Sequence, residues 1–191
     1  MTLYARVTEV EKSYSPQEFE TLPEFDERYE LVDGKLVKKP MPGGQHGSIA
    51  RRINKRVNLF DPDDKFGIMW FDTTFDVGTG WLPIPDLGYV VTSRIPAITE
   101  KAIKCVPDLV VEIHSPSDSR SKAEREATEK KIRDWQKVGV SIIWAINPET
   151  KMVAVYHPHP AEPIMELGLE DELNGEAVIP GFKLRVGELF G

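Results

Sequence analysis

The sequence predicts an α/β or α+β domain in which a mixed central sheet is flanked by helices. A strand, a helix and a second strand follow one another over residues 109–147, and strands joined through a helix pair in parallel. The remaining strands are separated by short turns, which is typical of antiparallel hairpins. A chain of 191 residues, 40% of them hydrophobic, is long enough for one buried core and short for two. We therefore expect a single domain over residues 1–191.

A short helix and a hairpin are expected first. Ser15 is a typical N-cap, and a helix from Gln17 to Leu22 should follow it. In YELVDGKLV, the Asp33-Gly34 pair is the preferred two-residue turn between antiparallel strands. The strands on either side of this turn are expected at Glu30 to Val32 and Lys35 to Val37.

A second helix, from about Gln45 to Leu59, should follow a run of prolines and glycines. Its stretch HGSIARRINKRVNLF places cations on one side of the helix and apolar residues on another. This cationic side is either a solvated helix face or a nucleic-acid-binding patch. In the second case, Arg51, Lys55 and Arg56 would contact phosphates.

Apolar runs separated by turn residues complete the predicted sheet. A long helix should follow SPSDS and end at about Val138, because Gly139 stops it. SIIWAI should form a buried strand, and VIPGFKLRVGELF should supply one or two more. The other strands are expected at Gly67 to Val77, Leu87 to Val91, Leu109 to Ile113 and Met152 to Tyr156.

Composition excludes several classes of protein. No segment approaches the roughly 20 apolar residues that span a bilayer, and the N-terminus carries acids where a signal peptide is apolar. We therefore expect a cytoplasmic protein without a membrane segment. The single cysteine, Cys105, excludes an internal disulfide and a Cys-based zinc cluster. The net charge of -7 argues against coating nucleic acid by bulk charge, although a local site remains open.

Two acids lie in the apolar run VPDLVVEIHSPSDS, where an unpaired charge is costly. They are Asp108 and Glu112. If the strands from Leu87 and Leu109 are antiparallel neighbours, Asp86 lies beside Glu112, with about 5 Å between the strand axes. Asp108 would lie about 13 Å from Glu112, at the far end of the strand. Mg²⁺ or Mn²⁺ bound by Asp86 and Glu112 would keep both acids charged.

Two further side chains are candidates for the same site. His114 lies two residues beyond Glu112 and so projects from the same face of the strand. Lys131 falls within the apolar arc of its helix, so it either meets an anion or reaches solvent. A helix that runs back for about 12 residues would carry Lys131 some 18 Å from the Glu112 end. Residues 115–122 must then swing outward, or Lys131 serves Asp108 instead.

Ordinary structural roles stay open beside this hypothesis. Asp86 and Asp108 follow prolines, where an aspartate commonly forms a turn or a cap. Glu112 could form a salt bridge within the sheet, and His114 could be a hydrogen-bonded structural residue.

Together these residues resemble the Uma-two family of endonuclease-like proteins, a bacterial group expanded in cyanobacteria and assigned to the PD-(D/E)XK nuclease superfamily. The order and spacing of the motifs carry the resemblance. They are RYELVDGKLV, PGGQHGSIA, Pro85-Asp86, PDLVVEIHSPS, Lys131-x-x-x-Trp135-x-x-x-Gly139-Val140 and IIWAINP.

The resemblance implies a restriction-endonuclease-like fold and a metal-dependent phosphodiesterase core. Asp86 and Glu112 match the acids of the superfamily motif, and Lys131 matches a helix lysine of the family. Glu30 and His46 match two further positions of the family. The superfamily lysine is expected two residues after Glu112, where this chain has a histidine.

Three functions follow as hypotheses. The first is an endonuclease that hydrolyses DNA with Mg²⁺ or Mn²⁺, expected to act as a homodimer. The second is a catalytically silent relative that serves as a binding or regulatory partner. The third is another kind of hydrolase, with His157 and His159 as ligands.

Overall fold

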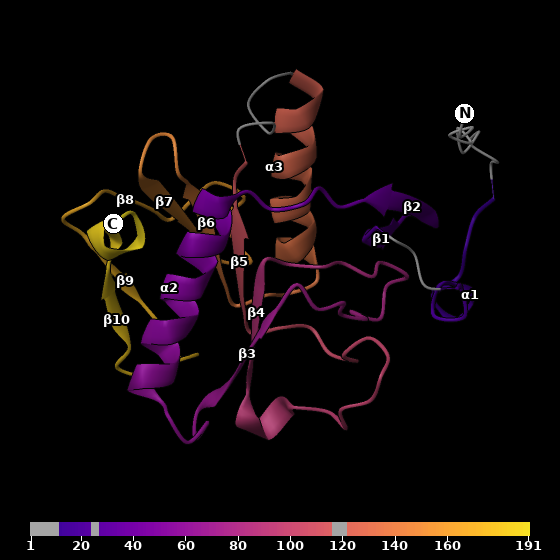
Figure 1. The fold of residues 1–191 in the computed structure, drawn as a ribbon, viewed down its shortest axis with the longest axis horizontal. Helices are drawn as coiled ribbons and strands as arrows, with labels where there is room; N and C mark the ends of the chain where they lie inside the picture. Colours follow the sequence, from indigo (N-terminus) through magenta and orange to yellow (C-terminus); the bar gives the residue numbers. More distant parts are fainter. Residues whose placement is uncertain (1–11, 24–26, 116–121) are drawn as a thin grey trace, which may run out of the picture.

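A computed structural model describes residues 12–23, 27–115 and 122–191 of the chain. Its centre is a six-stranded sheet in the order β3-β4-β5-β6-β7-β8 (Figure 1). Strands β5 and β6 run parallel, and each other neighbouring pair in this sheet runs antiparallel. The predicted mixed sheet with one parallel crossover is therefore confirmed. The strands are β3 (Gly67–Phe71), β4 (Leu87–Val91), β5 (Leu109–Ile113), β6 (Ile142–Asn147), β7 (Met152–Tyr156) and β8 (Met165–Leu167).

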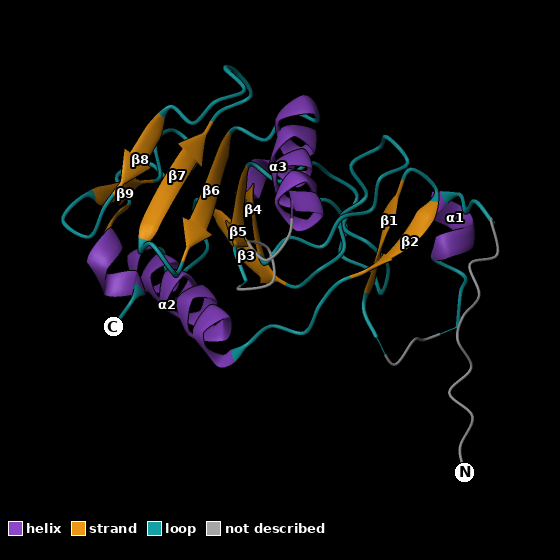
Figure 2. Ribbon diagram, turned by 90° about the horizontal axis from the view of Figure 1, so that it is seen from above, coloured by secondary structure: helices purple, strands orange, loops and turns teal. Residues whose placement is uncertain are grey.

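Two long helices cover opposite faces of this sheet, as Figure 2 shows. Helix α2 (Gly44–Phe60) packs on one face through Ile49, Ile53 and Val57. Helix α3 (Lys122–Lys137) packs on the other face through Ile132 and Trp135. The C-terminal segment closes the core on the α2 side. Its elements are β9 (Glu172–Asn174), β10 (Lys183–Arg185) and the 3-10 helix η2 (Val186–Leu189).

Strand β5 explains how an acid comes to point at α3. All five of its residues are buried, and successive side chains of a strand point to opposite faces. Val111 belongs to the core on the α2 side, whereas Val110 belongs to the core on the α3 side. Glu112 lies two residues beyond Val110 and therefore projects toward α3.

A separate two-stranded ribbon lies beside the sheet. It consists of β1 (Tyr29–Val32) and β2 (Lys35–Lys38), joined by the predicted Asp33-Gly34 turn. Both turn residues have positive φ, 51° and 77°, as the preferred hairpin turn requires. Leu31 docks the ribbon on the chain between β3 and β4 through two backbone hydrogen bonds with Leu82, of 3.2 and 2.9 Å.

Several predicted boundaries were wrong. The strand expected from Gly67 to Val77 ends at Phe71, because Asp72 adopts a left-handed φ of 40° that turns the chain away. The first helix, α1 (Pro16–Phe19), keeps the Ser15 cap but ends before Leu22. Strands β8 and β9 were not predicted. Between β4 and β5 the chain also forms the 3-10 helix η1 (Thr92–Arg94). The expected outward swing of residues 115–122 falls mostly on residues 116–121, which lie outside the described residues.

Among the residues that the structure describes, none forms a helix that is both long and apolar enough to cross a bilayer.

Asp108 lies at the start of β5 and has its own partners there. Its side chain accepts a hydrogen bond of 2.9 Å from the backbone N–H of Val91, and it forms an ion pair with Arg94. Only 7% of the residue is exposed. Asp108 thus ties β5 to the end of β4, as expected for a structural residue.

We predict that Asp108→Ala lowers the free energy of unfolding by about 2 kcal/mol, because a buried N–H and a guanidinium lose their acceptor. Urea unfolding measures this loss. Asp63→Ala is the control, since Asp63 forms an exposed pair with Lys65 and should change stability by less than about 0.5 kcal/mol. Equal losses in the two variants would contradict a structural role for Asp108.

Candidate functional site

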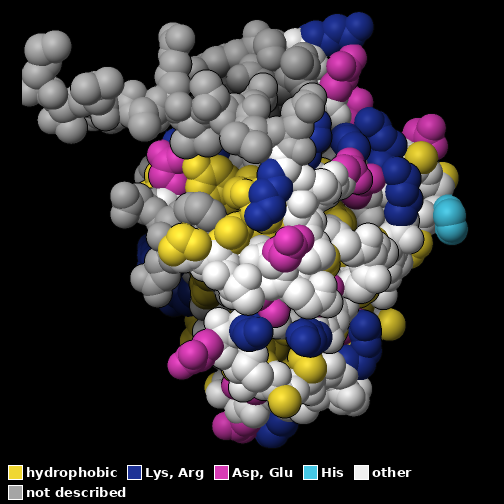
Figure 3. Space-filling model, turned by 90° about the vertical axis from the view of Figure 1, so that its right-hand side faces the viewer, with side chains coloured by type: hydrophobic (Ala, Val, Ile, Leu, Met, Phe, Trp, Pro, Cys, Tyr) yellow, Lys and Arg dark blue, Asp and Glu magenta, His cyan; other side chains and the backbone are white. Residues whose placement is uncertain are grey.

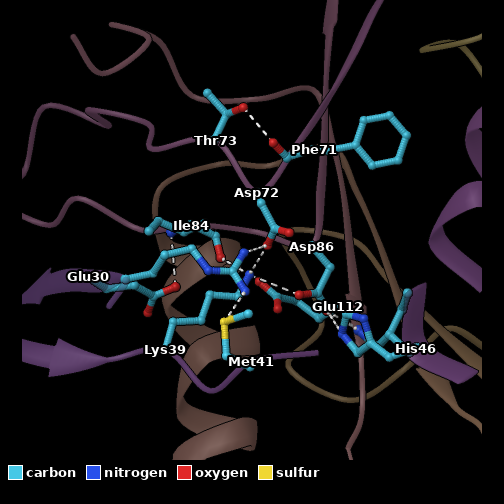
Figure 4. A network of polar contacts seen from close by, with 12 residues as sticks. Glu30, Lys39, Met41, His46, Phe71, Asp72, Thr73, Ile84, Asp86 and Glu112 are labelled. Atoms are coloured by element: carbon cyan, nitrogen blue, oxygen red, sulfur yellow. Dashed lines mark hydrogen bonds and ion pairs between the residues drawn. The ribbon is translucent and has the colours of Figure 1, made fainter. Parts of the chain in front are cut away.

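The register of the sheet brings Asp86 and Glu112 together. Strand β4 pairs antiparallel with β5, with Leu87 opposite Val111, so the next pair outward is Asp86 and Glu112. The backbone N–H of Ile113 donates a hydrogen bond of 2.7 Å to Asp86 Oδ2. Both acids line one pocket of about 380 Å³, between β2 and α3. Their side chains face each other in Figure 4.

Two nitrogen-bearing side chains contact the Asp86 carboxylate. Lys39 Nζ lies 2.9 Å from Oδ1, and His46 Nε2 lies 2.9 Å from Oδ2. His46 stands in the first turn of α2, which places it at this end of the sheet. Burial alone would raise the pKa of Asp86, but the hydrogen bond to His46 and the charges of Lys39 and Lys131 together lower it below its ordinary range. Asp86 is therefore held ionised.

Glu112 is held by two side chains of α3. Lys131 Nζ lies 3.1 Å from Glu112 Oε1, and Trp135 Nε1 donates a hydrogen bond of 2.8 Å to the same oxygen. Residues four apart share one face of a helix, so both reach one acid. Burial raises the pKa of Glu112 to about 7, although Lys131 opposes that shift. Its negative charge is thus only partly compensated.

Lys131 joins the sheet to the β1-β2 ribbon. Besides Glu112, its ammonium contacts Glu30 Oε1 at 2.8 Å and the carbonyl oxygen of Ile84 at 3.2 Å. Glu30 Oε1 also accepts a hydrogen bond of 2.9 Å from the Ile84 N–H. Burial would lower the pKa of Lys131, but Glu112, Glu30 and Asp86 raise it above its ordinary value.

The distance problem for Lys131 is resolved by the position of α3. In Figure 1, the N-terminal end of α3 projects past the end of β5, so the helix does not begin level with Glu112. Lys131, nine residues into the helix, then comes level with the acid. The alternative in which Lys131 serves Asp108 was wrong.

Sequence reasoning missed Lys39, which follows β2 in the stretch KKP. Its ammonium contacts Asp72 Oδ1 at 3.1 Å and the Ile84 carbonyl oxygen at 2.8 Å, besides Asp86. The sequence does indicate the backbone of Lys39, because a residue that precedes a proline is usually extended and does not continue a helix. Its partners lie more than 30 positions further along the chain, and no local spacing indicates them.

The remaining site candidates are placed as follows. His114 lines the pocket, and its backbone N–H donates to Ile146 of β6 at 2.8 Å. Arg51, Lys55 and Arg56 lie on α2 and are not among the residues that line the pocket. Arg56 forms an ion pair with Glu188 of η2, so one of the three cations is engaged in holding the C-terminal segment.

The candidates for other chemistry lie away from the pocket. Cys105 is half-buried, and burial raises the pKa of its thiol, which disfavours a reactive thiolate. His157 lies 2.9 Å from Glu176, and no group of three His, Cys, Asp or Glu side chains poised for a metal occurs within 12–23, 27–115 and 122–191.

The charges of the ion-paired groups in the pocket do not balance. Three carboxylates, of Glu30, Asp86 and Glu112, meet two ammonium groups, of Lys39 and Lys131. One negative charge is therefore in excess, which agrees with the raised pKa of Glu112. Mg²⁺ and Mn²⁺ prefer such hard oxygen ligands. Asp86 and Glu112 fit the role of metal ligands if Lys39 or His46 moves away from the Asp86 oxygen that it contacts.

We predict that Lys131→Met lowers the free energy of unfolding by about 3 kcal/mol, because Glu30 and Glu112 lose a buried cation. Lys130→Met removes the same charge from an exposed position of α3 and should cost less than about 0.5 kcal/mol. Urea unfolding of both variants at neutral pH measures the difference. A similar cost for the two substitutions would show that Lys131 is not a buried counter-ion.

The raised pKa of Glu112 predicts a pH dependence of stability in the absence of metal. A folded pKa of about 7 lies above the ordinary value of 4.5, so Glu112 contributes most below pH about 4.5 and loses that contribution as the pH rises through about 7. We expect Glu112→Gln to gain stability relative to the wild type between pH 5 and 8. Urea unfolding across this range, with a chelator present, tests this. A constant difference would mean that Glu112 does not titrate there.

Comparisons with known proteins agree with this fold. The profile of the Uma2 family, described as "Putative restriction endonuclease", matches residues 16–187. The structure is similar to a crystal structure from Anabaena variabilis ATCC 29413, described as "a putative nuclease belonging to DUF820". Their TM-score is 0.76 and their sequence identity is 26%, over 92% of this chain and 97% of that chain. No curated protein matches the sequence. The chain belongs to the Uma2 family.

Proposed function

We propose that this protein is a metal-dependent endonuclease that hydrolyses phosphodiester bonds of DNA. The observation that carries the proposal is the convergence of Asp86, Glu112 and Lys131 on one pocket. Membership of a restriction-endonuclease family supports it. We also propose that residues 1–191 act as one nuclease-like domain.

In this proposal, Asp86 and Glu112 hold Mg²⁺ or Mn²⁺. Such an ion polarises the scissile phosphate and lowers the pKa of a bound water. Asp86 suits a ligand because its environment keeps it ionised. Trp135 fixes the Glu112 carboxylate by donating to one of its oxygens, so the second acid keeps its orientation toward the pocket.

Lys131 and the residues around it have supporting roles. The Lys131 ammonium contacts the pocket acids and is available to orient a water or to stabilise charge that develops on the phosphate. Glu30 keeps this ammonium in position. His46 orients Asp86, and His114 lines the same pocket as a candidate proton acceptor.

DNA would be held by local contacts and not by a uniformly basic surface. On the face in Figure 3, Lys and Arg side chains are interspersed with Asp and Glu side chains. Arg51 and Lys55 are exposed on α2, the helix that carries His46 into the pocket, and we propose that they contact flanking phosphates. Arg56 would first have to leave Glu188. We further expect a homodimer, as is common for enzymes that meet both strands.

A catalytically silent binding protein is the second candidate. Its support is the engagement of Asp86 by Lys39 and His46, together with a histidine in place of the superfamily lysine. In such a protein the ion pairs serve folding alone.

Plasmid cleavage in Mg²⁺ and in Mn²⁺ separates the two candidates. We expect Asp86→Asn and Glu112→Gln to lower the cleavage rate at least about a hundredfold, because each removes a charged ligand while keeping the side-chain shape. Asp134→Asn is the matched control. Asp134 lines the same pocket but pairs with Lys130 and Lys137, so its variant should cleave like the wild type.

Three outcomes count against the nuclease proposal. Cleavage that survives both active-site substitutions would reveal a contaminant or another site. Cleavage that a chelator leaves intact would exclude the metal-dependent mechanism. A wild-type protein that cleaves with neither metal would support the silent binding protein.

A further inference from the structure

The ammonium group of Lys39 occupies a position that resembles a cation site. Three oxygens from different parts of the chain surround it, as Figure 4 shows. Asp86 Oδ1 lies at 2.9 Å, Asp72 Oδ1 at 3.1 Å and the Ile84 carbonyl oxygen at 2.8 Å. Carboxylate and carbonyl oxygens are also the ligands that hard metal ions prefer. The side chain is only 11% exposed, so the charge is largely withdrawn from solvent.

Asp86 and Glu112 differ in which of their carboxylate oxygens already have partners. Both oxygens of Asp86 are engaged, Oδ1 by Lys39 and Oδ2 by His46 and the Ile113 N–H. Glu112 is contacted through Oε1, and among the described residues no hydrogen bond or ion pair involves its Oε2. A cation that binds both acids must therefore compete with an existing partner of Asp86 for one of its oxygens, whereas Glu112 offers one that has no partner among the described residues.

Lys39 is the partner that can leave. The Ile113 N–H is part of the backbone of β5, and His46 is fixed by the first turn of α2. The backbone of Lys39 is also anchored, since its N–H donates to the Arg28 carbonyl at 2.8 Å. Its ammonium, however, stands on a flexible four-carbon stem. The charge can swing away from Asp86 while the ribbon stays in place.

We propose that Lys39 is an internal counter-ion that a divalent cation must displace from Asp86, and that it thereby sets the metal affinity of the site. This inference rests on the proposed role of Asp86 and Glu112 as metal ligands. The ammonium stabilises Asp86 when no metal is bound and competes with the metal for the same oxygen. Removing the ammonium should therefore strengthen metal binding.

The test measures Mn²⁺ binding by calorimetry, without any nuclease assay. We expect Lys39→Met to lower the dissociation constant at least about tenfold relative to the wild type. Lys39→Gln is a second variant, whose amide can still donate to Asp86 but carries no charge, and it should show the same direction. Mn²⁺ should also raise the melting temperature of both variants more than that of the wild type.

Lys35→Met is the matched control, because it removes one positive charge from an exposed position on the same ribbon. It should bind Mn²⁺ like the wild type. Circular dichroism checks that each variant is folded. If the wild type binds Mn²⁺ and both Lys39 variants bind it equally or more weakly, the counter-ion role is overturned while the nuclease proposal stands. If neither the wild type nor the Lys39 variants bind, the inference and the metal step of the nuclease proposal fall together.

Discussion

The arrangement of this site follows from one constraint, the burial of Glu112 at the end of the central strand β5. Glu112 is only 8% exposed, so its carboxylate is stable only with partners, and the fold supplies them from the α3 side. Lys131 and Trp135 reach the acid from one face of the helix. The compensation is incomplete, as the raised pKa of Glu112 shows. Folding alone does not require an acid here, because an apolar side chain would be buried at lower cost.

The parts of the site that follow from local periodicity could be predicted from the sequence. Antiparallel register alone places Asp86 beside Glu112, since it needs only the correct pairing of β4 and β5. Counting residues around α3 indicated that Lys131 faces the sheet. Its actual partners depend on where α3 begins relative to β5, and periodicity does not determine that offset.

The parts that were missed depend on contacts between distant segments. Lys39 meets Asp86 because the β1-β2 ribbon docks through Leu31, and nothing near KKP indicates that docking. Similarly, the strand expected to reach Val77 ends at Phe71 because the chain turns at Asp72, whose side chain pairs with the distant Lys39. The short strands β8 and β9 have three residues each, too few for an alternating pattern to be recognised.

The β1-β2 ribbon has a consequence for how the site comes apart. The ribbon is a sheet of its own, yet it carries Glu30 and precedes Lys39, while the acids at the end of the central sheet come from β4 and β5. The pocket is therefore a joint between two separately hydrogen-bonded units. Local opening of such a joint requires less free energy than unfolding of the whole chain. Loss of the ribbon would remove Glu30 and Lys39 from the charge cluster, whereas Glu112 and Lys131 belong to the sheet and to α3, so the charge balance of the site and the global stability of the chain are separate properties.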